Sequence, residues 1–372
     1  MVIPFLSLYL NKSLDISIPN IGWIMSFFGL GSLVGTWIGG KLTDKIGYYK
    51  VMFVSLVLTG IFFVLLQYIA TFEGFCISIF LVMLVADAFR PAMFVALSAY
   101  SKPENKTRSV TLIRMAINLG FSAGPAIGGL IITAIGYQGL FWVDGITCFL
   151  AAVLLLLVLH PKKAKIQDEV KVEHPVSAYS DKAFWVFFMA IFIFGFVFLQ
   201  YFSTMPLYYK DAHFLSELEI GLLMCFNGLF IFLFEMPLTK WLEDSKKSKI
   251  KLIAMGLFLF AMSFVVLNLT SWIGIVILGM FLMTIGEMIA FPFSNAFAVE
   301  RAKKGNQGEY MALYSISFSL AHIFSHNAGM QMLDKFGFEL TWNVITILAL
   351  VGVAILFLLM VFLENEKNEG SV

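Results

Sequence analysis

Long apolar runs, each close to the length of a membrane-spanning helix, fill most of this sequence. A helix needs about 20 residues to cross a hydrocarbon layer of about 30 Å. Only 13% of the 372 residues are charged, against roughly 25% in soluble domains, and the mean hydropathy is +0.88. The sequence therefore predicts an all-α integral membrane protein with eleven complete spans, near residues 18–40, 50–71, 74–99, 109–135, 138–160, 184–208, 217–241, 250–268, 272–299, 309–333 and 340–362.

The first ten residues, MVIPFLSLYL, are apolar but about half as long as a span. They lack the basic front end and the small-residue cleavage site of a signal peptide. We expect them to form the second half of a twelfth span, whose start is missing through a truncation or a misplaced start codon. A genuine half-span is the alternative.

Lysine and arginine residues gather in alternate connections, and this asymmetry predicts the orientation. Loops that stay in the cytoplasm keep these residues, and 20 of the 25 fall on one side, three on the other and two within spans. Both termini are therefore expected in the cytoplasm, which requires an even number of spans. The net charge of +1 indicates no nucleic-acid partner.

The longest connection, residues 161–183, is rich in charge and contains two prolines, as a linker does. It divides six spans in residues 1–160 from six in residues 184–372. The two parts also show a repeat, because IGWIMSFFGL at 21–30 and IGLLMCFNGL at 220–229 share six of ten residues. Internal repeats are typical of transporters, so we predict a duplicated six-helix unit.

Glycines and charges are concentrated in the stretch GGKLTDKIGYYK, residues 39–50. It resembles the signature loop Gly-x-x-x-Asp-(Arg/Lys)-x-Gly, followed by basic residues, between helices two and three of the major facilitator superfamily (MFS). The matching residues are Gly40, Asp44, Lys45, Gly47 and Lys50. Two tyrosines, at positions 48 and 49, stand where members often have basic residues. The resemblance implies a conformational gate in which Asp44 contacts the opposite half near residues 305–310.

A second motif, GFSAGPAIGG at residues 120–129, fits the pattern Gly-x-x-x-Gly-Pro-x-x-Gly-Gly that MFS antiporters carry on the fifth helix. The spacing of four predicts a glycine ridge against which another helix packs closely, and the proline loosens the helix. A simple packing ridge, as in Gly31, Gly35 and Gly39 of the second span, is the alternative. The motif residues are Gly120, Gly124 and Gly128, which form the ridge, with Pro125 and Gly129.

The resemblance extends over the whole chain and is strongest to the bacterial drug:proton antiporters. It implies two six-helix bundles that expose a central site alternately to each side of a bacterial-type cytoplasmic membrane. It further implies a small-molecule substrate, a monomeric protein, and a proton gradient in place of a cofactor. The fourth helix departs from the antiporter pattern, because Pro91 and Ala92 directly follow Arg90.

Ionisable residues inside spans are functional candidates, because a charge in hydrocarbon costs about 2.5 to 3.5 kcal/mol. Asp87 and Arg90 lie one helical turn apart and are expected to pair, and Arg114 lies near the start of the fifth span. Glu235 and Glu287 have no cation nearby in the sequence, so we expect them to be protonated and to carry the coupling proton or bind a cationic substrate. Neutral acids bonded to backbone carbonyls are the alternative.

Polar residues within phenylalanine-rich segments predict a cavity for an apolar or amphiphilic solute; these are Gln200, Tyr201 and Asn227. His322 and His326, four apart, share a helix face. They favour hydrogen-bonded packing or a proton-sensitive pair over a metal site, because no third ligand follows their pattern. The three cysteines lie in apolar runs and indicate neither disulfides nor a metal cluster.

Together these features predict proton-coupled export of small hydrophobic or amphiphilic compounds. Proton-coupled uptake of a nutrient by the same architecture is the alternative, and a carboxylate could serve Na⁺ as well as H⁺. A membrane-embedded enzyme or a sensor is not favoured, because no catalytic groups with recognisable spacing occur. The sequence also lacks the Gly-x-x-x-x-Gly-Lys-(Ser/Thr) loop of an ATP-driven machine.

Overall fold

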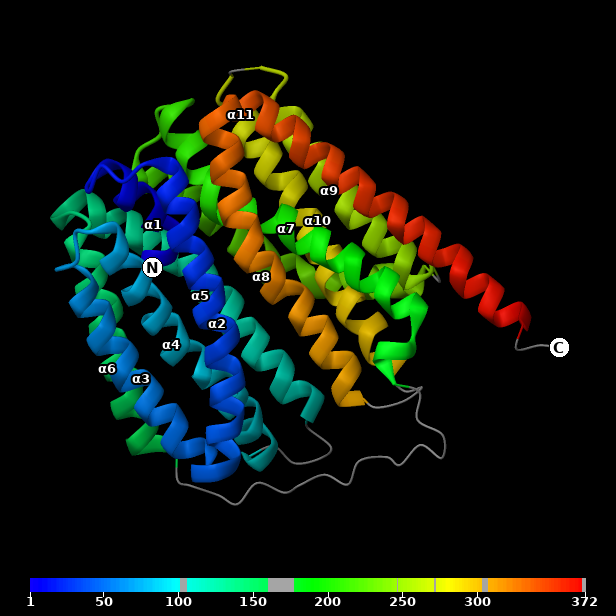
Figure 1. Cartoon of the computed structure of the whole chain (residues 1–372), viewed down its shortest axis with the longest axis horizontal. Coiled ribbons are helices and arrows are strands. Elements are labelled where there is room, and N and C mark those ends of the chain that lie inside the picture. The colour runs from blue at the N-terminus through cyan, green and yellow to red at the C-terminus, as the bar shows by residue number, and fades with distance from the viewer. Residues whose placement is uncertain (101–105, 160–176, 246, 271, 303–306, 370–372) are drawn as a thin grey trace. The chain divides into compact units, whose positions relative to one another are not determined.

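The computed structural model describes residues 1–372 except 101–105, 160–176, 246, 271, 303–306 and 370–372 (Figure 1). The described part is helical, as predicted. Its α-helices are α1 (Val2–Lys12), α2 (Ile18–Ile46), α3 (Tyr48–Leu66), α4 (Phe72–Tyr100), α5 (Lys106–Ile135), α6 (Gln138–Val158), α7 (Lys182–Asp211), α8 (Glu217–Asp244), α9 (Lys249–Leu267), α10 (Gly274–Ala302) and α11 (Gln307–Glu369).

Ten of these helices are long and apolar enough to cross a membrane. The last of them, α11, holds two of the predicted spans, because it is bent at Gly337, where φ is 72° and ψ is −176°. Its two arms fold back on one another in Figure 1 (orange and red). The eleven predicted complete spans are thus all present among the described helices. The apolar start of the chain is also helical, and α1 has eleven residues.

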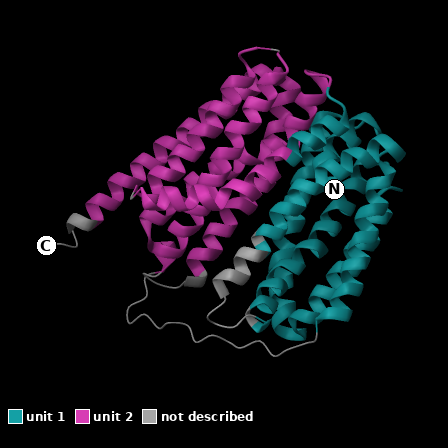
Figure 2. Ribbon diagram, turned by 180° about the vertical axis from the view of Figure 1, so that it is seen from behind, with its two compact units in different colours: residues 1–169, 215–225 teal, residues 170–214, 226–372 magenta. Residues whose placement is uncertain are grey.

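The chain forms two compact units (Figure 2). Unit 1 consists of residues 1–169 and 215–225, and unit 2 of residues 170–214 and 226–372. The units change near the predicted linker, but the first turns of α8 group with unit 1. Residues 160–176, most of that linker, lie outside the described part, so the division into six spans and six spans stays a prediction.

In unit 1, α2 and α4 pack in direct backbone contact. A Cβ atom added to Gly35 would lie 2.2 Å from the carbonyl oxygen of Leu84. Cβ atoms added to two other glycines of α2 would likewise collide with the backbone of α4. The contacting pairs are each 49 residues apart: Gly31 with Phe80, Gly35 with Leu84, and Gly39 with Ala88. This confirms the packing ridge predicted for the second span, and the constant offset shows that the two helices run parallel.

In unit 2, α7 lies at the centre and most of its residues are buried. The Phe194 ring packs against Phe260, Phe291 and Phe318, with ring centroids 4.8 to 6.0 Å apart. These partners belong to α9, α10 and the first arm of α11. These four rings therefore form part of the core between the helices of unit 2.

Candidate functional site

A polar group joins α8 to α10 inside unit 2. The side-chain amide of Asn227 donates to Oγ1 of Thr284 at 3.0 Å and to Oε2 of Glu287 at 3.1 Å. Thr284 and Glu287 are three residues apart, so they lie on one face of α10. Thr284 is fully buried, and Asn227 and Glu287 are half-buried. Two predicted residues, Asn227 and Glu287, are thus brought together near the middle of their helices.

The orientation of the Asn227 amide is fixed by its neighbours. The Thr284 hydroxyl donates to the carbonyl oxygen of Met280 at 2.7 Å, so toward Asn227 it can only accept. The amide NH₂ group therefore faces both Thr284 and Glu287. Its hydrogen bond to Oε2 can be accepted by a carboxylate or by the carbonyl oxygen of a neutral acid, so the contact is compatible with either form of Glu287.

Glu235 lies eight residues beyond Asn227 on α8 and is half-buried. Because eight residues correspond to slightly more than two helical turns, the two side chains are separated along the helix. The structure therefore places Glu287, but not Glu235, in hydrogen-bond contact with Asn227.

The charged residues of α4 form the ion pair that their spacing predicts. The distance between Arg90 Nη2 and Asp87 Oδ1 is 3.4 Å. Asp87 is 8% exposed, whereas the Arg90 side chain is 64% exposed, so the pair lies at the edge of the packed interior. The side chain of Arg114 is outside the described part of the structure.

The glycine motif of α5 makes close helix contacts, but two of the three glycines of the predicted ridge take no part in them. Nothing lies within 4 Å of a Cβ atom added to Gly120. A Cβ atom added to Gly124 would have only one atom within 4 Å, at a distance of 3.9 Å. Instead, a Cβ at Gly129 would lie 2.6 Å from the Glu217 carbonyl oxygen, and one at Gly221 would lie 2.4 Å from the Pro125 carbonyl oxygen. The start of α8 therefore meets Pro125 and Gly129, and of the three glycines of the predicted ridge only Gly128 makes a close contact.

Two further contacts complete the packing of this motif in unit 1. The Ser122 hydroxyl donates to the Cys225 carbonyl oxygen at 3.0 Å. Gly128 faces α1, where an added Cβ would lie 3.0 Å from the Phe5 ring. The motif therefore packs on two sides, with α8 and with α1.

The loop between α2 and α3 is a single residue, Gly47, with φ of 89°. This positive φ is readily adopted only by glycine, which confirms the tight reversal predicted from the signature. Asp44, Lys45 and Lys50 are exposed, and the ammonium group of Lys41 lies 3.7 Å from the centre of the Trp37 ring. Nothing lies within 4 Å of a Cβ added to Gly40. Residues 305–306 of the predicted partner segment are outside the described part.

The structure explains Tyr48, the first tyrosine of the signature stretch and the first residue of α3. Tyr48 is 6% exposed and packs with Val51, Met52, Ala92 and Ala96 of α3 and α4. Its ring also meets the Tyr100 ring edge-on at 6.3 Å. A basic side chain at this position would lose these apolar contacts, so Tyr48 contributes to the α3–α4 core.

Gln200 and Tyr201 are held in the packing of α7. The Gln200 amide donates to Oγ of Ser325 at 2.8 Å, and its Oε1 accepts from the Thr204 hydroxyl at 2.9 Å. The Tyr201 hydroxyl donates to Oγ of Ser263 at 2.9 Å. Both residues are buried, and their role in a substrate cavity stays a prediction.

The two histidines of α11 lie side by side, with ring centroids 5.6 Å apart. His326 is 1% exposed and His322 is half-buried. Within the residues that the structure describes, no three His, Cys, Asp or Glu side chains gather in a way that could hold a metal ion.

Sequence reasoning missed a buried ion cluster in unit 2, where α7 begins and α10 ends. Arg301 donates through Nε and Nη2 to both oxygens of Asp181, at 2.6 and 2.7 Å, and through Nη1 and Nη2 to both oxygens of Glu366, at 2.7 and 2.6 Å. The Tyr310 hydroxyl donates to Oδ2 of Asp181 at 2.9 Å. The cluster therefore ties α10 to both arms of α11 and to the residue that precedes α7.

Asp181 is also the N-cap of α7, where its Oδ1 accepts from the Phe184 N–H at 3.0 Å. Burial raises the pKa of Asp181. The hydrogen bonds and the positive charge of Arg301, together with the hydrogen bonds from Phe184 N–H and the Tyr310 hydroxyl, outweigh burial and hold the pKa below its ordinary value. Next to it, Glu309 accepts from the Ser177 hydroxyl at 2.7 Å and the Ala178 N–H at 3.1 Å. The end of the linker is thus bound to the start of α11.

Membrane-length helices in two compact units, with a carboxylic acid hydrogen-bonded between helices, are typical of a polytopic membrane transporter. The chain belongs to the Major Facilitator Superfamily, which it matches over residues 1–326. It is therefore an integral membrane protein and a secondary transporter, not an enzyme.

Individual relatives are distant. The chain is 21% identical over 358 residues to the MFS-type transporter YttB of Bacillus subtilis, covering 94% of this chain and 88% of YttB. It is 20% identical to a Na(+), Li(+), K(+)/H(+) antiporter of Planococcus maritimus, covering 100% and 94%. It is 25% identical over 241 residues to the quinolone resistance protein NorA of Staphylococcus aureus, covering 63% and 61%.

A solved structure shows the same fold. The crystal structure of a POT family transporter in complex with 5-aminolevulinic acid matches with a TM-score of 0.79 and 18% sequence identity. The match covers 97% of this chain and 91% of that transporter.

Proposed function

We propose that this chain is a proton-coupled antiporter that exports small hydrophobic or amphiphilic compounds by alternating access. It would act as a monomer in a bacterial-type cytoplasmic membrane, with both termini in the cytoplasm. The observation that carries the proposal is Glu287, a half-buried acid in the middle of α10 whose Oε2 accepts from Asn227. The antiporter pattern of α5 and the relatives named as a drug-resistance protein and a cation/H⁺ antiporter support it.

The chemistry of coupling follows from two opposing effects on Glu287. Removal from water favours the neutral acid, whereas a hydrogen-bond donor such as the Asn227 amide favours the carboxylate. A small change in hydration or in the distance to Asn227 can therefore shift the balance between the two forms. Alternating access would supply that change, because it exposes the same acid to each side of the membrane in turn.

Replacing Glu287 by glutamine is expected to abolish gradient-driven export. Glutamine keeps the size of the side chain and an oxygen that can accept from Asn227, but its amide cannot gain or lose a proton as a carboxyl group does. In liposomes with an imposed pH gradient and ethidium as the probe, we expect at least a tenfold loss of uphill transport, roughly 1.4 kcal/mol or more. Downhill equilibration of ethidium should be retained.

Glu339→Gln is the matched control, because Glu339 is an exposed acid of α11, and it should transport as the wild type does. Full gradient-driven transport by Glu287→Gln would remove Glu287 from the coupling site, and Glu235→Gln would then test the second predicted acid. Accumulation of probe together with inward proton flow would instead identify an uptake symporter.

We propose that Asp44 acts in the conformational gate that the signature loop implies. Its position supports this role, because it lies in the last turn of α2, where the negative end of the helix dipole disfavours a carboxylate. The same carboxylate at the N-terminus of another helix would be favoured by about 0.3 to 1 kcal/mol. Asp44 is thus poorly placed for the stability of its own helix and well suited to a contact that forms and breaks.

Asp44→Asn should slow turnover about two- to fivefold, as the same energy range implies, with little effect on substrate affinity. Thermal stability should stay equal or rise slightly, because an unfavourable charge leaves the end of α2. Transport kinetics and an unfolding scan on the same preparation measure both. Unchanged turnover would reduce the stretch to a polar turn, and a large fall in stability would show that Asp44 has a structural role.

A further inference from the structure

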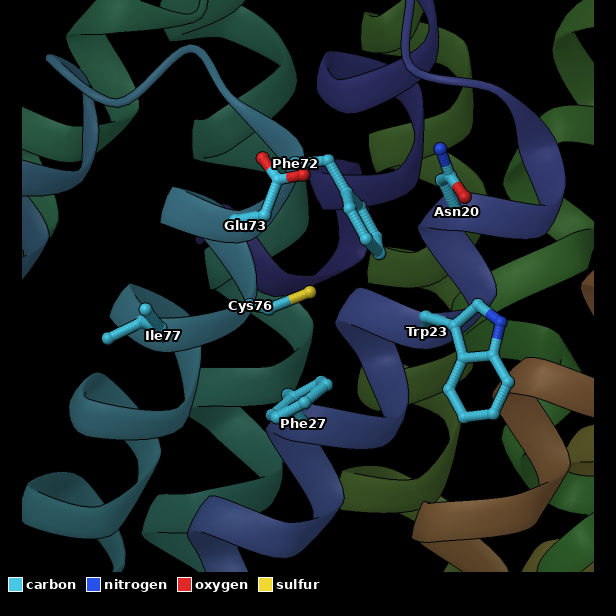
Figure 3. Close-up of a pocket in the computed structure, with 7 residues that line it drawn as sticks. All are labelled: Asn20, Trp23, Phe27, Phe72, Glu73, Cys76 and Ile77. Atoms are coloured by element: carbon cyan, nitrogen blue, oxygen red, sulfur yellow. The ribbon is translucent and has the colours of Figure 1, made fainter.

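A pocket of about 490 Å³ lies between the first turns of α2 and α4 in unit 1 (Figure 3). Its α2 wall includes Trp23 and Phe27, and its α4 wall includes Phe72 and Cys76. In Figure 3 the Phe72 ring and the Cys76 sulfur extend from α4 toward the space between the two helices. The volume falls within the roughly 300 to 1,000 Å³ of small-molecule sites.

The register of the two helices explains why the pocket forms there. Trp23 and Phe27 continue, at the same spacing of four, the α2 ridge that further along consists of Gly31, Gly35 and Gly39. With the same offset of 49 residues, they correspond to Phe72 and Cys76 on α4. Where the ridge is glycine, the helix backbones touch. Further toward the start of α2 the same ridge continues as Trp23 and Phe27, and there the pocket lies between the two helices.

The chemistry of the lining is specific. Three aromatic rings and a thiol supply most of the wall, Asn20 supplies an amide, and Glu73 is the single charged residue of the lining. Aromatic faces attract cations through the ring quadrupole, and an adjacent carboxylate adds a direct charge attraction. We propose that this pocket binds an organic monocation with bulky apolar groups.

Two features favour this ligand over a lipid chain. An acyl chain gains nothing from Glu73, and the anionic headgroups of bacterial lipids would be repelled by its carboxylate. Glu73 also lies in the first turn of α4, where it stabilises the helix dipole, so the experiment must separate binding from helix stability. A role of the pocket as a binding site on the export route rests on the proposed function. Binding of the cation does not rest on that function, because it can be measured without a proton gradient.

Protection of an introduced thiol provides the test. Ile77 is 61% exposed at the pocket and is replaced by cysteine; Val54, 48% exposed on α3 and outside the lining, is replaced by cysteine as the control. Purified full-length protein in phosphatidylcholine nanodiscs is labelled with a maleimide. Tandem mass spectrometry then locates the label residue by residue, because position 77 lies next to the native Cys76 on the same peptide. The ligand probes are tetraphenylphosphonium and tetraphenylborate, which share a shape and differ in the sign of charge.

We expect saturating tetraphenylphosphonium to slow labelling of Cys at position 77 about tenfold and to leave labelling at position 54 unchanged. In an Ile77→Cys background, Glu73→Gln should raise the protective concentration about tenfold. The unfolding temperature of the unliganded protein should fall only slightly, by the loss of one favourable charge at the start of α4. Equal protection by tetraphenylborate, or an unchanged protective concentration of tetraphenylphosphonium in Glu73→Gln, would overturn the cation site and identify a general apolar groove. Glu287→Gln should leave the protection of position 77 by tetraphenylphosphonium unchanged. A failure of the coupling proposal and a failure of this binding site can therefore be told apart.

Discussion

Replacing Arg301 by alanine should lower the free energy of unfolding of unit 2 by about 3 to 5 kcal/mol, the cost of removing one partner from a buried ion pair. Arg301 forms bidentate hydrogen bonds with both Asp181 and Glu366. Without it, two carboxylates would face each other, and Asp181, 6% exposed, would remain buried without its cation. The α7 N-cap and the second arm of α11 would lose their common partner, whereas the Tyr310 hydroxyl of the first arm bonds to Asp181 itself.

A thermal unfolding scan of purified protein measures this effect as a large fall in the apparent unfolding temperature. Arg301→Lys should give an intermediate value, because an ammonium group cannot replace the planar fork of a guanidinium toward two carboxylates. Lys335→Ala, which removes an exposed cation of α11, is the matched control and should be close to wild type. Equal stability of Arg301→Ala and Lys335→Ala would contradict a stabilising role for the cluster.

The pH dependence offers an internal check on the same variant. The pKa of Asp181 is lowered in the folded protein, so its contribution to stability is fully present above its ordinary pKa of about 3.9. It is lost as the pH falls through the lower, folded-state value. The contribution of Asp181 to the stability of the wild type should therefore be the same at about pH 8 and about pH 5, both above this window. In Arg301→Ala burial acts on Asp181 without the cation and raises its pKa, so the stability deficit of the variant should be no larger at about pH 5 than at about pH 8.

Replacing Gly35 by alanine should destabilise unit 1 by about 3 kcal/mol, at the upper end of typical overpacking costs. The added methyl group would lie 2.2 Å from the Leu84 carbonyl oxygen. Because this neighbour is backbone, no side-chain rotation can relieve the clash, and α2 and α4 must move apart along their whole contact.

Gly40→Ala on the same helix is the matched control, because nothing lies within 4 Å of its added Cβ. It should raise stability by about 0.5 to 1 kcal/mol, since alanine loses less backbone entropy than glycine in a helix. Unfolding temperatures should thus shift in opposite directions for the same chemical change. A shift of equal sign and size in both variants would show that the α2–α4 contact does not depend on the absence of a Cβ at position 35.

Features that depend on local sequence could be predicted well. Apolar length located all eleven complete spans, including the two that α11 joins, because the need to cross hydrocarbon acts on each segment separately. The Asp87–Arg90 ion pair and the reversal at Gly47 also followed from residues close together in the chain. In each case a single helix or turn contains the whole interaction.

Features that depend on which helices meet could not be predicted. The spacing in the α5 motif correctly indicated a close contact, but a helix with several glycines offers more than one face, and only the position of α8 selects Gly129 and Pro125. Glu287 was a candidate by its burial, yet its contact with Asn227, 60 residues away, required the packed structure. Arg301 and Asp181 are 120 residues apart, and in the sequence Arg301 counted only as a cytoplasmic cation.

The bend at Gly337 determines on which side of the membrane the chain ends. A straight helix over the 63 residues of α11 would be about 95 Å long, roughly three times the thickness of the hydrocarbon layer. The combination of positive φ with ψ near 180° is accessible to glycine almost exclusively, so this one residue turns a single long rod into an outgoing and a returning crossing. The parity of the membrane crossings, and with it the compartment that receives the C-terminus, depends on a residue without a side chain.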